Sequence, residues 1–130
     1  MTYQGERLER NVRELAGELR DPLILPCDVT RDEQIDVLAE SIRRDFHGLD
    51  FLVHAVAFAL REELEGSFLK TSRDGFRIAQ DISCYSLTAL ARQMAPLMEQ
   101  SGAGSIVTLT YMGGQRVVPN YNVMGLAKAS

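Results

Sequence analysis

The sequence is poor in several residues that mark particular classes of protein. Among its 130 residues there are two Cys, four Pro and no Trp. Cys27 and Cys84 are too far apart to form a zinc motif, and the two histidines, His47 and His54, do not complete one. We therefore expect no metal site, and two buried free thiols of the kind found in a reducing cytoplasm.

Charge and hydropathy exclude further classes. The formal net charge is −4 and no long run of Lys or Arg occurs, so nucleic-acid binding has no electrostatic support. No apolar run approaches the ~20 residues that span a membrane. The segment Met1–Arg7 lacks the apolar core of a signal peptide. Composition, with 45% hydrophobic and 25% charged residues, predicts one soluble globular domain that is cytoplasmic and binds neither nucleic acid nor membrane.

Apolar periodicity predicts helices and strands in alternation. The segment 51–59 is almost continuously apolar, which is typical of a strand covered on both faces in a parallel sheet. The segment 74–99 is apolar over a wide arc, which indicates a helix buried on two sides, with another subunit as a candidate for the second. The expected helices are 6–19, 30–47, 74–99 and one from Tyr121 onward, and the expected strands are 23–25, 51–59 and 105–111.

Local signals support this order of elements. Thr30 and Glu33 form a capping box, and Gly48 is expected to end the helix that they start. The polar segment 60–73 is interpreted as a loop or lid with a short helical turn. The alternation predicts a doubly wound, Rossmann-like α/β fold with a parallel sheet, in which residues 1–130 form a single domain. In such folds ligands bind beyond the carboxyl ends of the strands.

Three predicted strand ends carry residues suited to binding: Cys27–Val29, Val56–Ala59 and Tyr111–Gly113. After the third come Tyr121 and Lys128, which are about 700° apart on a helix and so share one face. A phenol and an ammonium directed at one point can stabilise an oxygen that gains negative charge. The same spacing is also found where a Tyr ring is only half-buried in a core and a Lys amine is only solvated, without a functional role. The position beyond a strand end favours the functional interpretation.

The chain has no G-x-G-x-x-G or related turn, which in a dinucleotide-binding fold cradles the pyrophosphate at a helix N-terminus. Met1–Tyr3 is interpreted as the tail of a strand, and Ala127–Ser130 stops a helix without a cap. We therefore expect an incomplete sheet that lacks its first strand, with the Gly-rich turn, and its C-terminal strands. On this interpretation the chain is a fragment of a longer protein.

Several segments together resemble a known enzyme family: Leu52–Ala59, Asp81–Ser86, and Leu109–Tyr111 with Val118–Ser130. They are similar to the NAD-dependent enoyl-(acyl-carrier-protein) reductases of bacterial fatty-acid synthesis, a divergent branch of the short-chain dehydrogenases/reductases. The resemblance covers nearly the whole chain. It is most specific in the last segment, where Tyr-x6-Lys replaces the Tyr-x3-Lys of the wider superfamily.

The resemblance implies that NADH reduces the trans-2 double bond of an enoyl thioester held by acyl carrier protein, in fatty-acid elongation. It implies catalytic roles for three residues. Tyr121 would donate to the enolate oxygen, Lys128 would hold the nicotinamide ribose and lower the phenol pKa, and Tyr111 would line the pocket as a second hydroxyl. Family members are commonly tetramers, so a homo-oligomer is expected.

The resemblance also assigns binding positions. Cofactor contacts are implied for Gln4, Asp28, Val29, Val56 and Lys128, and substrate contacts for Ala57, Phe58, Ala59, Tyr111 and Tyr121. Asp28 and His54 can also be explained by local structure alone. Asp28 could instead satisfy backbone donors ahead of Thr30, and His54, inside an apolar strand, is interpreted as a core histidine.

The residues that follow Tyr3 bear on the choice of cofactor, and two alternative functions stay open. Neutral Gln4 and acidic Glu6 precede Arg7, which favours NADH over NADPH because a 2′-phosphate needs a cation near this point. A 3-ketoacyl reductase of the same superfamily would carry Ser and Lys where this chain has Thr108 and Gly125. A non-catalytic chain that only packs against or binds a partner is the second alternative for these 130 residues.

Overall fold

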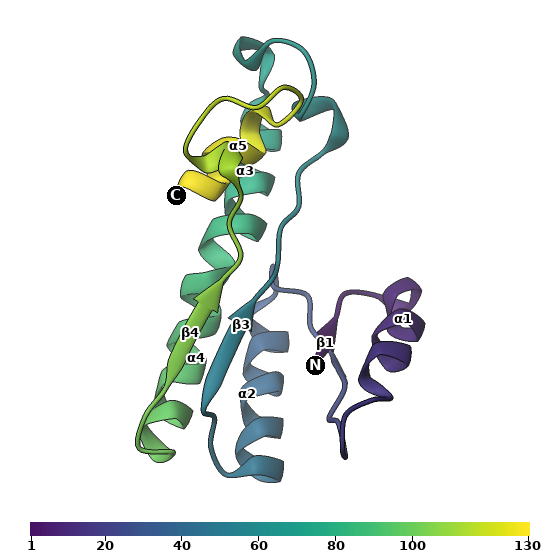
Figure 1. The fold of residues 1–130 in the computed structure, drawn as a ribbon, viewed down its shortest axis with the longest axis vertical. Coiled ribbons are helices and arrows are strands. Elements are labelled where there is room, and N and C mark those ends of the chain that lie inside the picture. The colour runs from purple at the N-terminus through teal and green to yellow at the C-terminus, as the bar shows by residue number, and fades with distance from the viewer.

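The structure, a computed structural model, describes all residues 1–130 and shows strands alternating with helices. The strands form two parallel pairs: β1 (Thr2–Tyr3) with β2 (Leu25–Pro26), and β3 (Phe51–His54) with β4 (Ser105–Thr108). The helices are α1 (Glu6–Ala16), α2 (Asp32–Phe46), α3 (Arg73–Gln80), α4 (Ser86–Gln100) and α5 (Asn122–Ala129). In Figure 1, α2 and α4 lie behind the β3–β4 pair, and α1 flanks β1. None of the helices combines the length and the apolar composition that crossing a bilayer requires.

The two strand pairs do not join into one sheet. A cleft of about 1080 Å³ separates them, bordered by Thr2 and Leu25 on one side and by Phe51–His54 on the other. The edge of β3 that faces this cleft therefore has no strand partner. Parallel pairing with an open centre confirms the predicted fold, an incomplete Rossmann-like α/β fold.

The hydrophobic core lies between α2 and α4, on one side of β3. Ile35 and Ala39 of α2 are buried together with Met94 and Leu97 of α4, and Leu52 of β3 packs against them. Burying each larger side chain contributes about 1.5–3 kcal/mol relative to exposure. This core is in the half of the molecule away from α5 (Figure 1), so it supports the strands whose ends lead to the site.

Strand β3 is shorter and more exposed than the sequence predicts. Its ladder ends at His54, and Ala55–Ala59 continues without secondary structure. Phe51 is 64% and Val53 52% exposed, because helices cover only the face that carries Leu52 and His54. The prediction of a strand covered on both faces is wrong for this chain.

The other strands also differ in their bounds. The strand expected at 23–25 lies at Leu25–Pro26, where the N–H groups of Leu25 and Cys27 donate to the carbonyls of Met1 and Tyr3. Pro26 falls between these two donors, at the position where no N–H is needed. Strand β4 ends at Thr108 rather than at 111, because β3 offers no ladder partner beyond His54.

The predicted capping box does not form. Helix α2 begins at Asp32 after Arg31, and no side chain caps it. The Thr30 hydroxyl donates instead to the carboxylate of Asp28, at 2.8 Å. The residue types of a capping box are therefore present, but the Thr30 hydroxyl binds Asp28 and not a backbone N–H of the helix.

Other helix ends also differ from the predictions. The left-handed residue after α2 is His47, with φ 62°, and Gly48 follows it. Gly48 lies close to Ser101, since a Cβ there would lie 2.3 Å from the Ser101 Oγ. Helix α1 ends at Ala16 rather than at Leu19, and Leu19 is exposed.

The helix predicted over 74–99 contains a π-turn, η3 (Asp81–Tyr85), between α3 and α4. The N–H of Ser86 donates to the carbonyl of Asp81, five residues earlier. In an α-helix that N–H would bind the Ile82 carbonyl, and here the Ser86 hydroxyl donates to it at 2.6 Å. The preceding loop contains two short 3₁₀ turns, η1 (Arg61–Glu63) and η2 (Phe68–Lys70), in agreement with the predicted loop and helical turn.

Candidate active site

Two tyrosines lie together beyond the carboxyl end of β4. The ring centroids of Tyr111 and Tyr121 are 4.9 Å apart, and the rings meet edge to face at 64°. Tyr111 precedes the 3₁₀ turn η4 (Met112–Gly114), and Tyr121 directly precedes α5. The structure thus brings together the two phenols that the sequence singled out.

Tyr121 stands before α5 and not inside it. Its φ of −133° and ψ of 14° are not helical, and its carbonyl accepts from the N–H of Gly125 at 2.6 Å. Tyr121 is thus the N-cap of α5, whereas the sequence predicts that it is one of the helical residues. The Lys128 ammonium donates to the Leu109 carbonyl at 2.6 Å, and no hydrogen bond joins it to Tyr121.

The pKa of Tyr121 moves in the direction opposite to the sequence-based expectation. Burial, followed by the neighbouring Tyr111, raises the pKa of the Tyr121 phenol. The expectation that Lys128 lowers this pKa is wrong in this structure, because Lys128 does not lie among the groups that shift it. Tyr121 consequently keeps its proton at neutral pH and can donate a hydrogen bond.

Three glycines allow η4 to approach α5 closely. A Cβ on Gly113 would lie 2.4 Å from a ring carbon of Tyr121, and one on Gly125 would lie 2.9 Å from the Gly113 carbonyl oxygen. A Cβ on Gly114 would lie 3.0 Å from the backbone carbonyl of Lys128. Side chains at these positions would push Tyr121 and Lys128 away from the end of β4.

His54 is a buried histidine that joins three elements. Its Nε2 lies 2.8 Å from the hydroxyl of Ser86 on α4, and its Nδ1 lies 3.0 Å from that of Thr108 on β4. Since Ser86 donates its proton to Ile82, it must accept from Nε2, so Nδ1 accepts from Thr108. Burial, followed by the charge of Lys128, lowers the pKa of His54 and keeps the ring neutral. This arrangement is the core histidine that the sequence indicated.

A cavity of about 360 Å³ lies beside this histidine. Lys128, Thr110 and the π-turn residues Ser83 and Cys84 border it. Cys84 is half-buried, whereas the sequence predicts a buried thiol, and Cys27 is buried; both thiols are free. No three side chains of His, Cys, Asp or Glu are grouped as ligands for a metal ion.

A second group of predicted residues lies at the ends of β1 and β2. Oδ1 of Asp28 accepts from the N–H of Thr30 at 3.0 Å and from its hydroxyl at 2.8 Å. Partial burial opposes ionisation, but these two bonds, the Gln4 amide and the charge of Arg31 hold the pKa of Asp28 below its usual value. Asp28 thus has the local role that the sequence left open, while its Oδ2 takes no part in the Thr30 bonds.

Val29 and Val56 face the cleft between the two strand pairs. Neither backbone group of either residue forms a hydrogen bond with another backbone group. The cofactor contacts expected at the ends of β2 and β3 therefore border one cleft. The two tyrosines adjoin η4 and α5, and α5 lies beyond the end of β4, away from β1 (Figure 1).

The residues expected to contact substrate follow β3. Ala57 and Phe58 are exposed and Ala59 is half-buried. The backbone N–H and carbonyl of Phe58 both bind the hydroxyl of Ser83, at 2.9 Å each. Nearby, the Asn122 amide at the start of α5 donates to the carbonyls of the 60–73 loop at Glu65 and Gly66.

The family follows from a comparison with known proteins. The family model described as Enoyl-(Acyl carrier protein) reductase matches residues 1–130. The chain belongs to this family. It is 55% identical over 131 residues to enoyl-(acyl-carrier-protein) reductase (NADH) FabI of Bacillus cereus, an alignment that covers 99% of this chain and 50% of that protein. The chain spans about half the length of the curated relatives it matches.

Solved structures agree with this family. The Bacillus cereus enoyl-acyl carrier protein reductase with NADP+ and indole naphthyridinone gives a TM-score of 0.93 at 54% identity, covering 99% of this chain and 50% of that one. The NADH enzyme of Aquifex aeolicus gives a TM-score of 0.93 at 50% identity, covering 98% and 50%. The open arrangement of two parallel strand pairs is therefore half of a known reductase fold.

Sequence reasoning missed the residues that support this site. Ser83, Ser86 and Asn122 were not singled out, and neither was the close packing that Gly113 allows. A signal was available for the two serines, because polar residues inside a buried helical run must find partners. The partners themselves, Phe58 and His54, are distant in sequence and follow only from the tertiary structure.

Proposed function

We propose that the protein containing this chain reduces the trans-2 double bond of enoyl thioesters carried by acyl carrier protein, with NADH, in fatty-acid elongation. The observation that carries the proposal is the edge-to-face pair of phenols, Tyr111 and Tyr121, beyond the end of β4 in a chain of this family. Its Bacillus cereus relative is named for this reduction.

Tyr121 would supply the central catalytic interaction. Addition of a hydride to the β-carbon of the substrate pushes negative charge onto the thioester oxygen. A phenol that keeps its proton can donate to that oxygen, and one preorganised donor of this kind contributes ~10²–10³ in rate. Tyr111, edge-on to Tyr121, would line the pocket and offer a second hydroxyl.

The residues present fit a bound NADH in part. The cofactor supplies the hydride, and groups at the ends of the strands would hold it. Asp28 Oδ2 would accept from the adenine amine, Gln4 would lie near the adenosine ribose, and Val29 and Val56 would offer backbone groups. Lys128 uses one of its three ammonium protons on Leu109, so the other two remain for the nicotinamide ribose.

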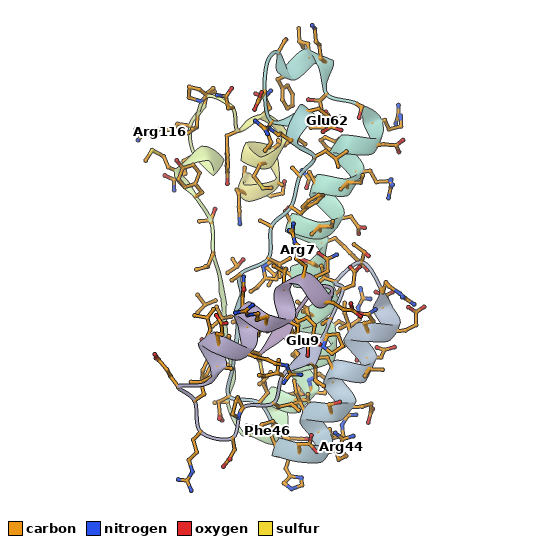
Figure 2. The ribbon with its side chains drawn as sticks, turned by 90° about the vertical axis from the view of Figure 1, so that its right-hand side faces the viewer. Arg7, Glu9, Arg44, Phe46, Glu62 and Arg116 are labelled. Carbon is orange, nitrogen blue, oxygen red and sulfur yellow. The ribbon has the colours of Figure 1, made fainter.

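NADH is the proposed reductant rather than NADPH. Gln4 is neutral and Glu6 is acidic, so the first cation after β1 is Arg7. Figure 2 shows Arg7 and Glu9 on α1, and Arg7 is exposed and forms no ion pair. The Bacillus cereus structure with NADP+ makes a direct kinetic comparison of the two cofactors informative. A clear preference for NADPH would contradict the assignment.

Partners and location are proposed from family membership. We infer a homo-oligomer, a tetramer as in related enzymes, and the exposed ring of Phe76 on α3 supports a further subunit contact along this helix. The substrate would arrive on acyl carrier protein. Two free thiols are in keeping with a cytoplasmic location. Residues 1–130 would form part of one Rossmann-like domain.

Two alternatives are weaker on specific observations. A 3-ketoacyl reductase would need a catalytic hydroxyl at position 108, and here the Thr108 hydroxyl is bound to Nδ1 of His54. A purely structural role is supported only for residues 1–130 by themselves, because the cleft between their strand pairs leaves an edge of β3 unpaired.

The test uses the whole protein and two substitutions. Tyr121→Phe should lower kcat on a crotonyl thioester by ~10²–10³ with little change in NADH affinity. Lys128→Ala should weaken NADH binding, measured by fluorescence titration. Tyr85→Phe, which removes an exposed phenol outside the pair, is the matched control. A fully active Tyr121→Phe enzyme would disprove the assigned role.

A further inference from the structure

The segment after β3 is held in place by a single side chain. From Ala55 to Ala59 no backbone N–H or carbonyl pairs with another backbone group. The Ser83 hydroxyl accepts from the N–H of Phe58 and donates to its carbonyl, both at 2.9 Å. One hydroxyl therefore satisfies both backbone groups of the residue in the middle of the expected substrate wall.

The π-turn brings this hydroxyl to Phe58. Ser83 lies within η3 and is 7% exposed, and Ser86 follows the turn. Ser86 completes the turn through Ile82 and accepts from His54 at the end of β3. Ser83 in the turn and Ser86 directly after it thus anchor the continuation of β3 and the end of β3, respectively. π-turns inside α-helices are frequently found at functional sites, where they redirect side chains.

We propose that Ser83 is a positioning residue that fixes the backbone of Ala57–Ala59, against which the acyl part of the enoyl thioester lies. This inference rests on the proposed function. Without the hydroxyl, the segment loses its only hydrogen bonds to the rest of the chain. Tyr121 and Lys128 are held by other elements, so the chemistry of bound substrate should be less affected than its binding.

The experiment compares three variants of the whole protein. Ser83→Ala removes the clamp, and Ser83→Thr keeps a hydroxyl. Ser41→Ala is the matched control, because Ser41 is a buried serine on α2 that bonds only its own helix, at the Val37 carbonyl. Each variant is assayed for kcat and for KM of crotonyl thioester and NADH, and residues 55–60 are followed by amide hydrogen exchange.

Ser83→Ala should raise KM for the thioester by about tenfold. KM for NADH should stay within about twofold, because Val56 lies close to His54, which remains bound to Ser86 and Thr108. Exchange at the Phe58 amide, whose N–H the Ser83 hydroxyl binds, should be faster than in wild type and in Ser41→Ala. Ser83→Thr should restore both properties toward wild type. This split between two KM values separates positioning from a general loss of structure.

Two results would overturn the inference. In one, Ser83→Ala lowers kcat, raises KM for both the thioester and NADH, and lowers thermal stability. That combined loss is what substitution of a merely structural residue would produce. In the other, exchange at the Phe58 amide or KM for the thioester is unchanged. A wild-type protein that does not reduce enoyl thioesters would instead refute the proposed function, and the exchange measurement would still test the clamp.

Discussion

Replacing Gly113 with Ala should displace the candidate catalytic phenol by a calculable distance. The new Cβ would lie 2.4 Å from Cδ1 of Tyr121, whereas ordinary contacts begin at 3.4 Å, so the ring must move by 3.4 − 2.4 = 1.0 Å. The Tyr111 ring, edge-on at 4.9 Å, limits the directions in which Tyr121 can move. A misplacement of about 1 Å can cost about 10²-fold in rate, or about 2.7 kcal/mol of transition-state stabilisation.

The assay is the loss of NADH absorbance with a crotonyl thioester, using the whole protein. Gly113→Ala should lower kcat about 10²-fold, and the overpacked ring should also lower the free energy of unfolding by about 1–3 kcal/mol without unfolding the protein. Gly17→Ala is the control, since Gly17 has φ −61° and its Cβ would meet only the α1 backbone, at 3.3 Å or more. A Gly113→Ala enzyme with wild-type kcat would refute the steric argument.

Two further predictions concern the buried histidine network. Ser86→Ala leaves a buried Nε2–H of His54 without a partner and removes the bond to the Ile82 carbonyl. The free energy of unfolding should therefore fall by about 1–3 kcal/mol, which is more than in Ser41→Ala. Equal losses for the two variants in urea unfolding would contradict this. Burial, followed by the charge of Lys128, lowers the pKa of His54 below its ordinary 6.5, so the folded state binds fewer protons than the unfolded state. The contribution of His54 to stability should therefore be fully present above about pH 6.5 and be lost as the pH drops through the folded pKa. In His54→Gln, the midpoint of urea unfolding should depend less on pH between about pH 7 and 5 than it does in wild type.

Much of the fold could be predicted because periodicity and strand composition act locally. The parallel pairing of Leu52 and Val53 with the 105–108 strand follows from apolar runs separated by helices. Element ends were less predictable. Thr30 has the residue type and spacing of a helix cap, yet its hydroxyl binds Asp28, and a pattern of residue types cannot distinguish two acceptors that are both within reach.

The π-turn shows a different limit. The run Asp81–Ser86 fits an α-helical pattern as well as any, and nothing local demands an extra residue in the turn. The turn is stabilised by the Ser86 hydroxyl and by contacts of Ser83 and Ser86 with Phe58 and His54. Those contacts join residues that are tens of positions apart, so they exist only after β3 has packed against α4.

The sequence by itself determined the family and the alternation of strands and helices, and it pointed to Tyr121 and Lys128 as candidate site residues, because each of these depends on residue type and spacing along the chain. The tertiary structure alone decided how these residues are held. It placed Tyr121 ahead of α5 with a raised pKa, and it directed Lys128 to the Leu109 carbonyl. The physical reason is that burial, close approach and hydrogen-bond partners are properties of the space between elements, which spacing along one element does not describe.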